Sequence, residues 1–135
     1  MLKARWENAL AFQAFLETAR SHTDLWHEIY RRARIPGELL QRAATLERRW
    51  KLLVLSEDWC GDAVNTVPVA ARLAELSGTM ELRILARDQN PDLMDTHLTG
   101  TSRSIPVIMA LDTREVGVHQ VGVLVAGQDA TRTPT

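Results

Sequence analysis

The spacing of apolar residues changes at residue 51, and this change constrains the fold more than any other feature of the sequence. Up to that point apolar side chains recur every three or four positions, as on one face of a helix. The run that follows, residues 51–56, is short and almost continuously apolar, which is typical of a strand buried on both faces. The sequence therefore predicts a helical first part and a second part built on a sheet.

Residues 1–50 are predicted to form three helices. An apolar helical face runs along residues 12–19, and the polar segment 21–24 breaks it. A second apolar face follows in residues 25–33. Pro36 falls near the first turn of a third helix, where its fixed φ and missing N–H are tolerated, and that helix runs toward Glu47.

Strands and helices alternate after residue 50. A helix is predicted over 61–76, strands over 80–86 and 105–112, a short helix over 92–98, and a hairpin partner strand over 116–123. Such alternation favours parallel strands joined by right-handed crossovers, and the final hairpin adds antiparallel strands. We therefore expect an α/β fold in which helices flank a mixed sheet.

Length and charge favour a single domain that binds neither nucleic acid nor membranes. The 135 residues suffice for one core and divide into a helical extension (1–50), a core (51–125) and a polar tail (126–135). A net charge of −1 gives no general attraction to nucleic acid or anionic lipid. No run approaches the roughly 20 apolar residues of a membrane span. Because the amphipathic N-terminus is unlike a signal peptide, we expect the protein in the cytoplasm.

Cys60 is the single cysteine of the chain, and it lies where the first predicted strand gives way to a helix. Any disulfide that it forms is therefore intermolecular, with a small thiol or another protein. A thiol in the first turn of a helix faces unpaired N–H groups and the positive end of the helix dipole, which favour the thiolate. Three nearby carboxylates, those of Glu57, Asp58 and Asp62, disfavour it. Either effect can dominate.

The residues around Cys60 resemble the W-C-G-P-C active site of thioredoxins. Trp59, Cys60 and Gly61 match its first three letters, and Ile105-Pro106, between a helix and an apolar strand, matches the thioredoxin cis-proline. The resemblance covers roughly residues 50–125 and implies a thioredoxin fold with Cys60 as the nucleophile. It further implies that Trp59 forms the rim, that Gly61 gives a partner's backbone room, and that Ile105 and Pro106 contact the substrate.

A closer resemblance is to a bacterial thioredoxin-like group that has a helical N-terminal extension and the signature E-D-W-C-G-D, followed by A or C. The matching segments are residues 57–63, Arg87-Asp88-Gln89-Asn90, Leu93-Met94-Asp95 and Ile105-Pro106. Because these separate matches occur in the same order as in the group, they reinforce the predicted fold.

Two parts of the thioredoxin site are missing. Ala63 stands where thioredoxins have a second, resolving cysteine. Val54 stands where they bury an acid, and the lysine paired with that acid falls near Ile84. An external thiol must therefore release any mixed disulfide. Asp58 and Asp62 are candidate proton acceptors in place of the buried acid, and the chemistry needs no organic cofactor.

Three functions are compatible with the sequence. In the first, Cys60 exchanges with a protein or low-molecular-weight disulfide, or is oxidised by a peroxide, to give a mixed disulfide. In the second, the chain is a non-catalytic module that binds extended peptide beside the cis-proline. In the third, two chains share a metal or iron–sulfur cluster through Cys60 and an external thiol. The four histidines are scattered along the sequence, so no metal site within one chain is expected.

Overall fold

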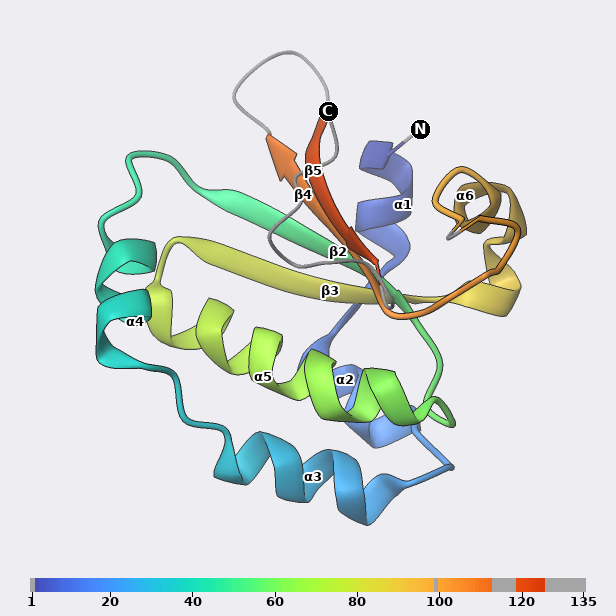
Figure 1. Ribbon diagram of the computed structural model, residues 1–135, viewed down its shortest axis with the longest axis horizontal. Helices are drawn as coiled ribbons and strands as arrows, with labels where there is room; N and C mark the ends of the chain where they lie inside the picture. The colour runs from blue at the N-terminus through green and yellow to red at the C-terminus, as the bar shows by residue number, and fades with distance from the viewer. Residues whose placement is uncertain (1, 99, 113–118, 126–135) are drawn as a thin grey trace.

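The computed structural model describes residues 2–98, 100–112 and 119–125. In chain order the elements are α1 (Leu2–Asn8), β1 (Leu10–Ala11), α2 (Phe12–Thr18), α3 (Thr23–Arg32), α4 (Gly37–Ala44), β2 (Trp50–Ser56), α5 (Gly61–Ser77), β3 (Met80–Ala86), η1 (Arg87–Gln89), α6 (Pro91–Asp95), β4 (Val107–Asp112) and β5 (His119–Val125). The strands form one sheet in the order β1-β3-β2-β4-β5, and Figure 1 shows helices on both sides of it. Within these residues no helix is long and apolar enough to cross a membrane.

The sheet is mixed, as the sequence predicts. Strand β2 runs parallel to β3, with α5 as the crossover between them, and β4 runs antiparallel to both β2 and β5. Among its described residues, the connection from β3 to β4 contains only η1 and the short α6, so it does not carry the chain back along the sheet. Strand β4 therefore begins at the end of the sheet where β2 and β3 finish, and Val107 lies opposite Leu55.

The N-terminal segment differs from the prediction, because residues 1–50 are not wholly helical. The strand β1 separates α1 from α2 and pairs antiparallel with β3, with Leu10 opposite Ile84 and Ala11 opposite Arg83. Leu10 and Ala11 are too few to show the alternating pattern of a strand, and they lie within an amphipathic helical run. The strand that they pair with, β3, lies about 70 residues further along the chain. The prediction of a purely helical first part is wrong for this reason.

Two apolar layers cover the two faces of the sheet. On one face α2, α3 and α5 pack against Val54 of β2, and Trp26 lies at the centre of this layer with no exposed surface. On the other face Trp6 of α1 and Met94 of α6 pack against the neighbouring β2 residues Leu53 and Leu55. Residues 53–56 of β2 are thus buried on both faces, which confirms the interpretation of the apolar run for this half of the strand, whereas residues 50–52 are only partly buried.

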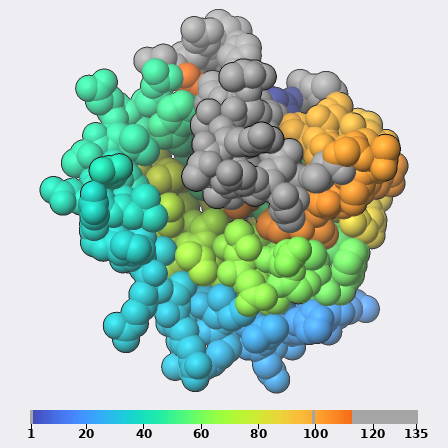
Figure 2. Space-filling view, in the orientation of Figure 1, coloured from blue at the N-terminus to red at the C-terminus, as the bar shows by residue number. Residues whose placement is uncertain are grey.

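The N-terminal helices pack against the sheet and against α5. Figure 2 shows α3 in blue and α4 in cyan gathered along one border of the molecule, with α5 in green beside them. On the opposite face the Trp6 ring contacts two cations of the sheet, with Lys51 Nζ and Arg83 Cζ each 4.7 Å from a Trp6 ring centroid. Both faces of the sheet therefore depend on residues that precede β2.

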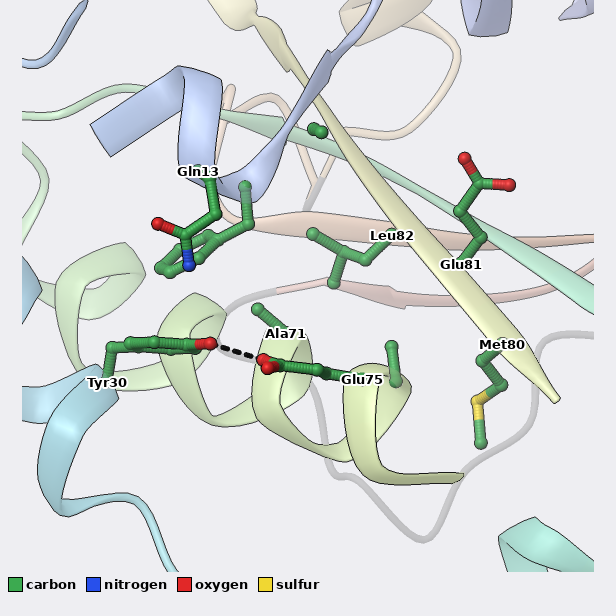
Figure 3. A pocket seen from close by; sticks show the side chains of 10 residues that line it. Gln13, Tyr30, Ala71, Glu75, Met80, Glu81 and Leu82 are labelled. Atoms are coloured by element: carbon green, nitrogen blue, oxygen red, sulfur yellow. Dashed lines mark hydrogen bonds between the residues drawn. The ribbon is translucent and has the colours of Figure 1, made fainter. Parts of the chain in front are cut away.

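A cavity of about 250 Å³ lies between α2, α5 and β3. Figure 3 shows the Tyr30 hydroxyl, which donates a hydrogen bond to the Glu75 carboxylate, at the border of this cavity. Burial of the hydroxyl, together with the Glu75 carboxylate, raises the pKa of Tyr30. The cavity lies toward the C-terminal end of α5, at the opposite end of that helix from Cys60.

Candidate functional site

Cys60 is the N-cap residue of α5. Its backbone is extended, with φ −82° and ψ 121°, and its carbonyl accepts a 3.0 Å hydrogen bond from the Val64 N–H. The side chain is half-buried and touches both apolar layers. The sulfur therefore lies at the N-terminus of a 17-residue helix, where free N–H groups and the helix dipole favour a negative charge.

The Cys60 thiol lies against the segment that leads into β4. Its Sγ is 3.7 Å from the Ile105 carbonyl oxygen, a weak hydrogen bond in which the thiol donates. The Ile105–Pro106 peptide bond is cis, and both residues are buried. The structure thus brings together the thiol and the two residues that the sequence resemblance assigns to substrate contact.

Trp59 forms an exposed rim beside the thiol. Its side chain is 47% exposed, and the Arg87 guanidinium carbon lies 5.0 Å from the centroid of its ring. Arg87 also donates a 3.0 Å hydrogen bond to the carbonyl oxygen of Arg103, two residues before Ile105. Arg87 therefore joins the two segments that border the sulfur. Sequence reasoning missed this role, and its only signal was the position of Arg87 in the R-D-x-N segment.

The three carboxylates near Cys60 have different environments. A Glu57 oxygen accepts a hydrogen bond from the Asp88 backbone N–H at 3.0 Å. The Asp58 carboxylate accepts from two backbone N–H groups of the segment that joins α2 to α3. Asp62 lies in the first turn of α5, is exposed, and has no hydrogen bond or ion pair within the described part of the chain. Only Asp62 is therefore left to solvent.

Gly61 leaves open space at the first turn of α5. A Cβ atom built on Gly61 would meet no atom within 4 Å apart from its chain neighbours and its own helix backbone, so this flank of the turn is unobstructed. A partner's backbone can approach there without displacing a side chain.

The layer beneath Cys60 is apolar. Val54 and Ile84 lie opposite each other on the adjacent parallel strands β2 and β3, with 0% and 2% exposure. These are the positions where the thioredoxin resemblance would place the acid and its lysine. Ala63 is also fully buried. The described residues contain no group of three or more His, Cys, Asp or Glu that could hold a metal ion.

Comparison with known proteins assigns the fold to a family. The thioredoxin family profile matches residues 9–126, which is most of the chain. The chain belongs to the thioredoxin family. Two solved structures superpose on it, a protein of unknown function from Pseudomonas aeruginosa and an HIV epitope scaffold. Each is 23% identical with a TM-score of 0.76 over 88% of this chain, and the matches cover 72% and 73% of those chains.

These similarities confirm the thioredoxin fold that the resemblance implies. At 23% identity the two structures support the fold alone. Among curated proteins, none matches the chain. The chemistry of this family member therefore has to be argued from the geometry around Cys60.

Proposed function

We propose that the protein carries out thiol–disulfide exchange through the single thiol of Cys60. The observation that carries the proposal is the position of the sulfur. It lies at the N-terminus of α5, within 3.7 Å of the Ile105 carbonyl and beside the exposed ring of Trp59. A thiol at a helix N-terminus, in contact with solvent, has the environment of a reactive rather than a structural cysteine.

The reaction has two exchange steps. Cys60, as the thiolate, attacks one sulfur of a disulfide, forms a mixed disulfide with it, and releases the other sulfur as a thiolate. An external thiolate then attacks the partner's sulfur in the mixed disulfide, forms a new disulfide with the partner, and releases Cys60. Each step breaks one S–S bond and forms another, so no further oxidant or reductant enters.

The neighbouring residues have separate roles in this proposal. Asp62 accepts the proton that the Cys60 thiol loses, because its carboxylate is exposed and engaged with no other group in the described chain. Trp59 and the open flank at Gly61 shape the approach of the partner. Ile105 and Pro106 offer the partner a backbone edge beside the sulfur.

We also propose two finer assignments that accompany this chemistry. The first is membership of the bacterial group with the E-D-W-C-G-D signature, which the sequence of residues 57–63 supports. The second exchange step needs a pool of reduced thiols, which is the condition of the cytoplasm, so we propose that location. Low-molecular-weight thiols and protein disulfides are the partner classes that fit.

A second candidate is a non-catalytic module that binds extended peptide in the same groove. The apolar pair Val54–Ile84 and the buried Ala63 favour it, because the internal proton relay and the resolving sulfur are both replaced by packing. Backbone pairing beside Pro106 would need neither.

The two candidates are separated by mass spectrometry of the native protein after incubation with a small neutral disulfide such as hydroxyethyl disulfide. Exchange predicts a single adduct on Cys60 that an external thiol removes, and no adduct on the Cys60→Ser variant. Ala63→Cys is the matched test, because a cysteine there would displace the partner and keep the adduct from accumulating. If the native protein forms no adduct while the unfolded protein does, the binding module is the better account.

A further inference from the structure

The loop that carries Cys60 is tied to the N-terminal segment through one residue, Asp58. Its carboxylate oxygen Oδ2 accepts hydrogen bonds from the backbone N–H groups of Arg20, at 2.8 Å, and Ser21, at 3.2 Å. Its main-chain carbonyl accepts a third, at 2.8 Å, from the indole Nε1–H of Trp26. Asp58 lies two residues before Cys60, whereas these donors are 32 or more residues away in sequence.

The Trp26 donor is held rigidly. Its side chain has no exposed surface and packs edge-on against Phe15, with the ring centroids 4.9 Å apart, and against Phe12 at 6.5 Å. A buried indole N–H needs an acceptor, since leaving it unpaired costs free energy. Here the acceptor is the Asp58 carbonyl, so the loop is tied to α3 through this one hydrogen bond.

Packing between the loop and the N-terminal segment is incomplete on one side. A cavity of about 290 Å³ lies there, bordered by Glu57 and Asp58 of the loop, by Phe15, Thr18 and Ala19 of the N-terminal segment, and by residues of β3 and η1 among others. The three hydrogen bonds to Asp58 are therefore direct links between the loop and the N-terminal segment beside this cavity.

We propose that Asp58 and Trp26 are positioning residues, which hold the 57–60 loop against the N-terminal segment so that Cys60 stays at the N-cap of α5. This rests on the proposed function of Cys60. It assigns Asp58 a role different from the proton acceptor that the sequence suggested, because its Oδ2 accepts the N–H groups of Arg20 and Ser21 and so ties the carboxylate to the α2–α3 connection. The N-terminal segment is then part of the machinery that keeps the thiol reactive.

Three variants separate positioning from proton transfer. Asp58→Asn keeps an amide oxygen that can accept the same two N–H groups, whereas Asp58→Ala removes the acceptor, and both lose the same charge. Trp26→Phe keeps an aromatic ring but removes the Nε1–H. Phe12→Leu is the matched control, because it loosens the same aromatic cluster and leaves the Trp26–Asp58 bond in place.

The readout is the rate of Cys60 alkylation by iodoacetamide at neutral pH, with thermal melting to show that each variant is folded. We expect Asp58→Ala to react about two- to fivefold more slowly than Asp58→Asn, the size of a helix-terminus effect on charge at exposed sites. Trp26→Phe should be slowed to a similar extent relative to wild type, and Phe12→Leu should keep the wild-type rate. The double variant Asp58→Ala/Trp26→Phe should be no slower than the slower single variant, because both changes release the same loop.

Equal rates for Asp58→Asn and Asp58→Ala would overturn the proposal, and so would a Phe12→Leu variant as slow as Trp26→Phe. If Trp26→Phe does not fold, the two Asp58 variants decide alone, since Asp58 is only half-buried and lies outside the core. Alkylation does not need a disulfide substrate. Failure of native Cys60 to exchange with disulfides would therefore count against the proposed function, and the alkylation rates of the variants could still be compared.

Discussion

Cys60 differs from an ordinary buried cysteine in what surrounds its sulfur. The thiol contacts the Ile105 carbonyl, its residue caps α5, and the carboxylates of Glu57 and Asp58 are engaged with backbone N–H groups of other segments. Beneath it, Val54 and Ile84 form a dry apolar pair. At the scale of single residues, the site has a cysteine where thioredoxins have their first active-site cysteine, and apolar side chains where they have their buried acid and its lysine.

This apolar pair predicts what restoring the relay would do. Val54→Asp should lower the free energy of unfolding by roughly 3–5 kcal/mol, because it buries an unpaired carboxylate at a site with no exposure. Val54→Asn, of similar shape but neutral, separates the charge from the change of packing. Adding Ile84→Lys, on the facing strand position, should recover part of the loss. Urea unfolding gives the free energy of unfolding of wild type, the two Val54 variants and the double variant Val54→Asp/Ile84→Lys. A double variant no more stable than Val54→Asp would argue against a pairing of the two side chains.

At the scale of elements, α5 positions the site and its two ends are fixed differently. Cys60 begins the helix, and Gly78 ends it in the left-handed conformation with φ 72°. Gly78 is the residue that allows the chain to turn from α5 into β3, because other residues adopt this backbone conformation at a cost.

Gly78→Ala should therefore lower the free energy of unfolding by about 1–2 kcal/mol. An added Cβ would meet no atom within 4 Å, so the loss would come from backbone conformation and not from a clash. Gly37→Ala is the control, since Gly37 has equal space for a Cβ and no positive φ. Chemical denaturation of both variants checks this, and equal losses at the two glycines would refute the explanation.

The helices α1 and α6 are joined by an ion pair that gives stability a pH dependence. The Arg5 guanidinium hydrogen-bonds to the Asp92 carboxylate and, at 2.8 Å, to the Asn90 side-chain oxygen. The hydrogen bond from Arg5 holds the pKa of Asp92 below its ordinary value of 3.8. Because the folded value is lowered, this stabilisation is present above the ordinary pKa and is lost as the pH falls through the folded value.

Asp92→Asn should consequently be less stable than wild type near neutral pH, and the difference should shrink in acid. The midpoints of urea unfolding at neutral and strongly acidic pH measure it. Arg5→Gln should behave in the same way, and combining the two changes should add little. A gap between wild type and Asp92→Asn that stays constant with pH would contradict this assignment.

The first 50 residues are an integral part of the whole molecule. Trp6 packs on one face of the sheet, Trp26 in the layer on the other, and β1 extends the sheet edge. The family match begins at residue 9, which agrees with this arrangement. The protein is thus a thioredoxin fold in which N-terminal elements complete both layers.

The sequence predicts much of this arrangement, for reasons that can be named. A continuous apolar run identifies β2 because its second half lies within the core, and the period of α5 identifies its buried face. The motif around Cys60 places the thiol at the start of that helix. Contacts between distant segments are not predictable in this way. The pairing of β1, the Arg87–Trp59 stack and the Trp26–Asp58 bond depend on tertiary structure and leave no local pattern.

The most direct test of the central claim is the rate of Cys60 alkylation by iodoacetamide between about pH 5 and pH 10, in native and in urea-unfolded protein. Cys60 is the only thiol, so one adduct mass reports it alone. We predict that native Cys60 is alkylated before unfolding and at neutral pH at least as fast as in the unfolded chain, because its half-buried thiol lies at the N-terminus of α5, in the environment of a reactive cysteine. Native alkylation slower than that of the unfolded chain across this range, or no reaction before unfolding, would contradict the exchange function and favour the peptide-binding module.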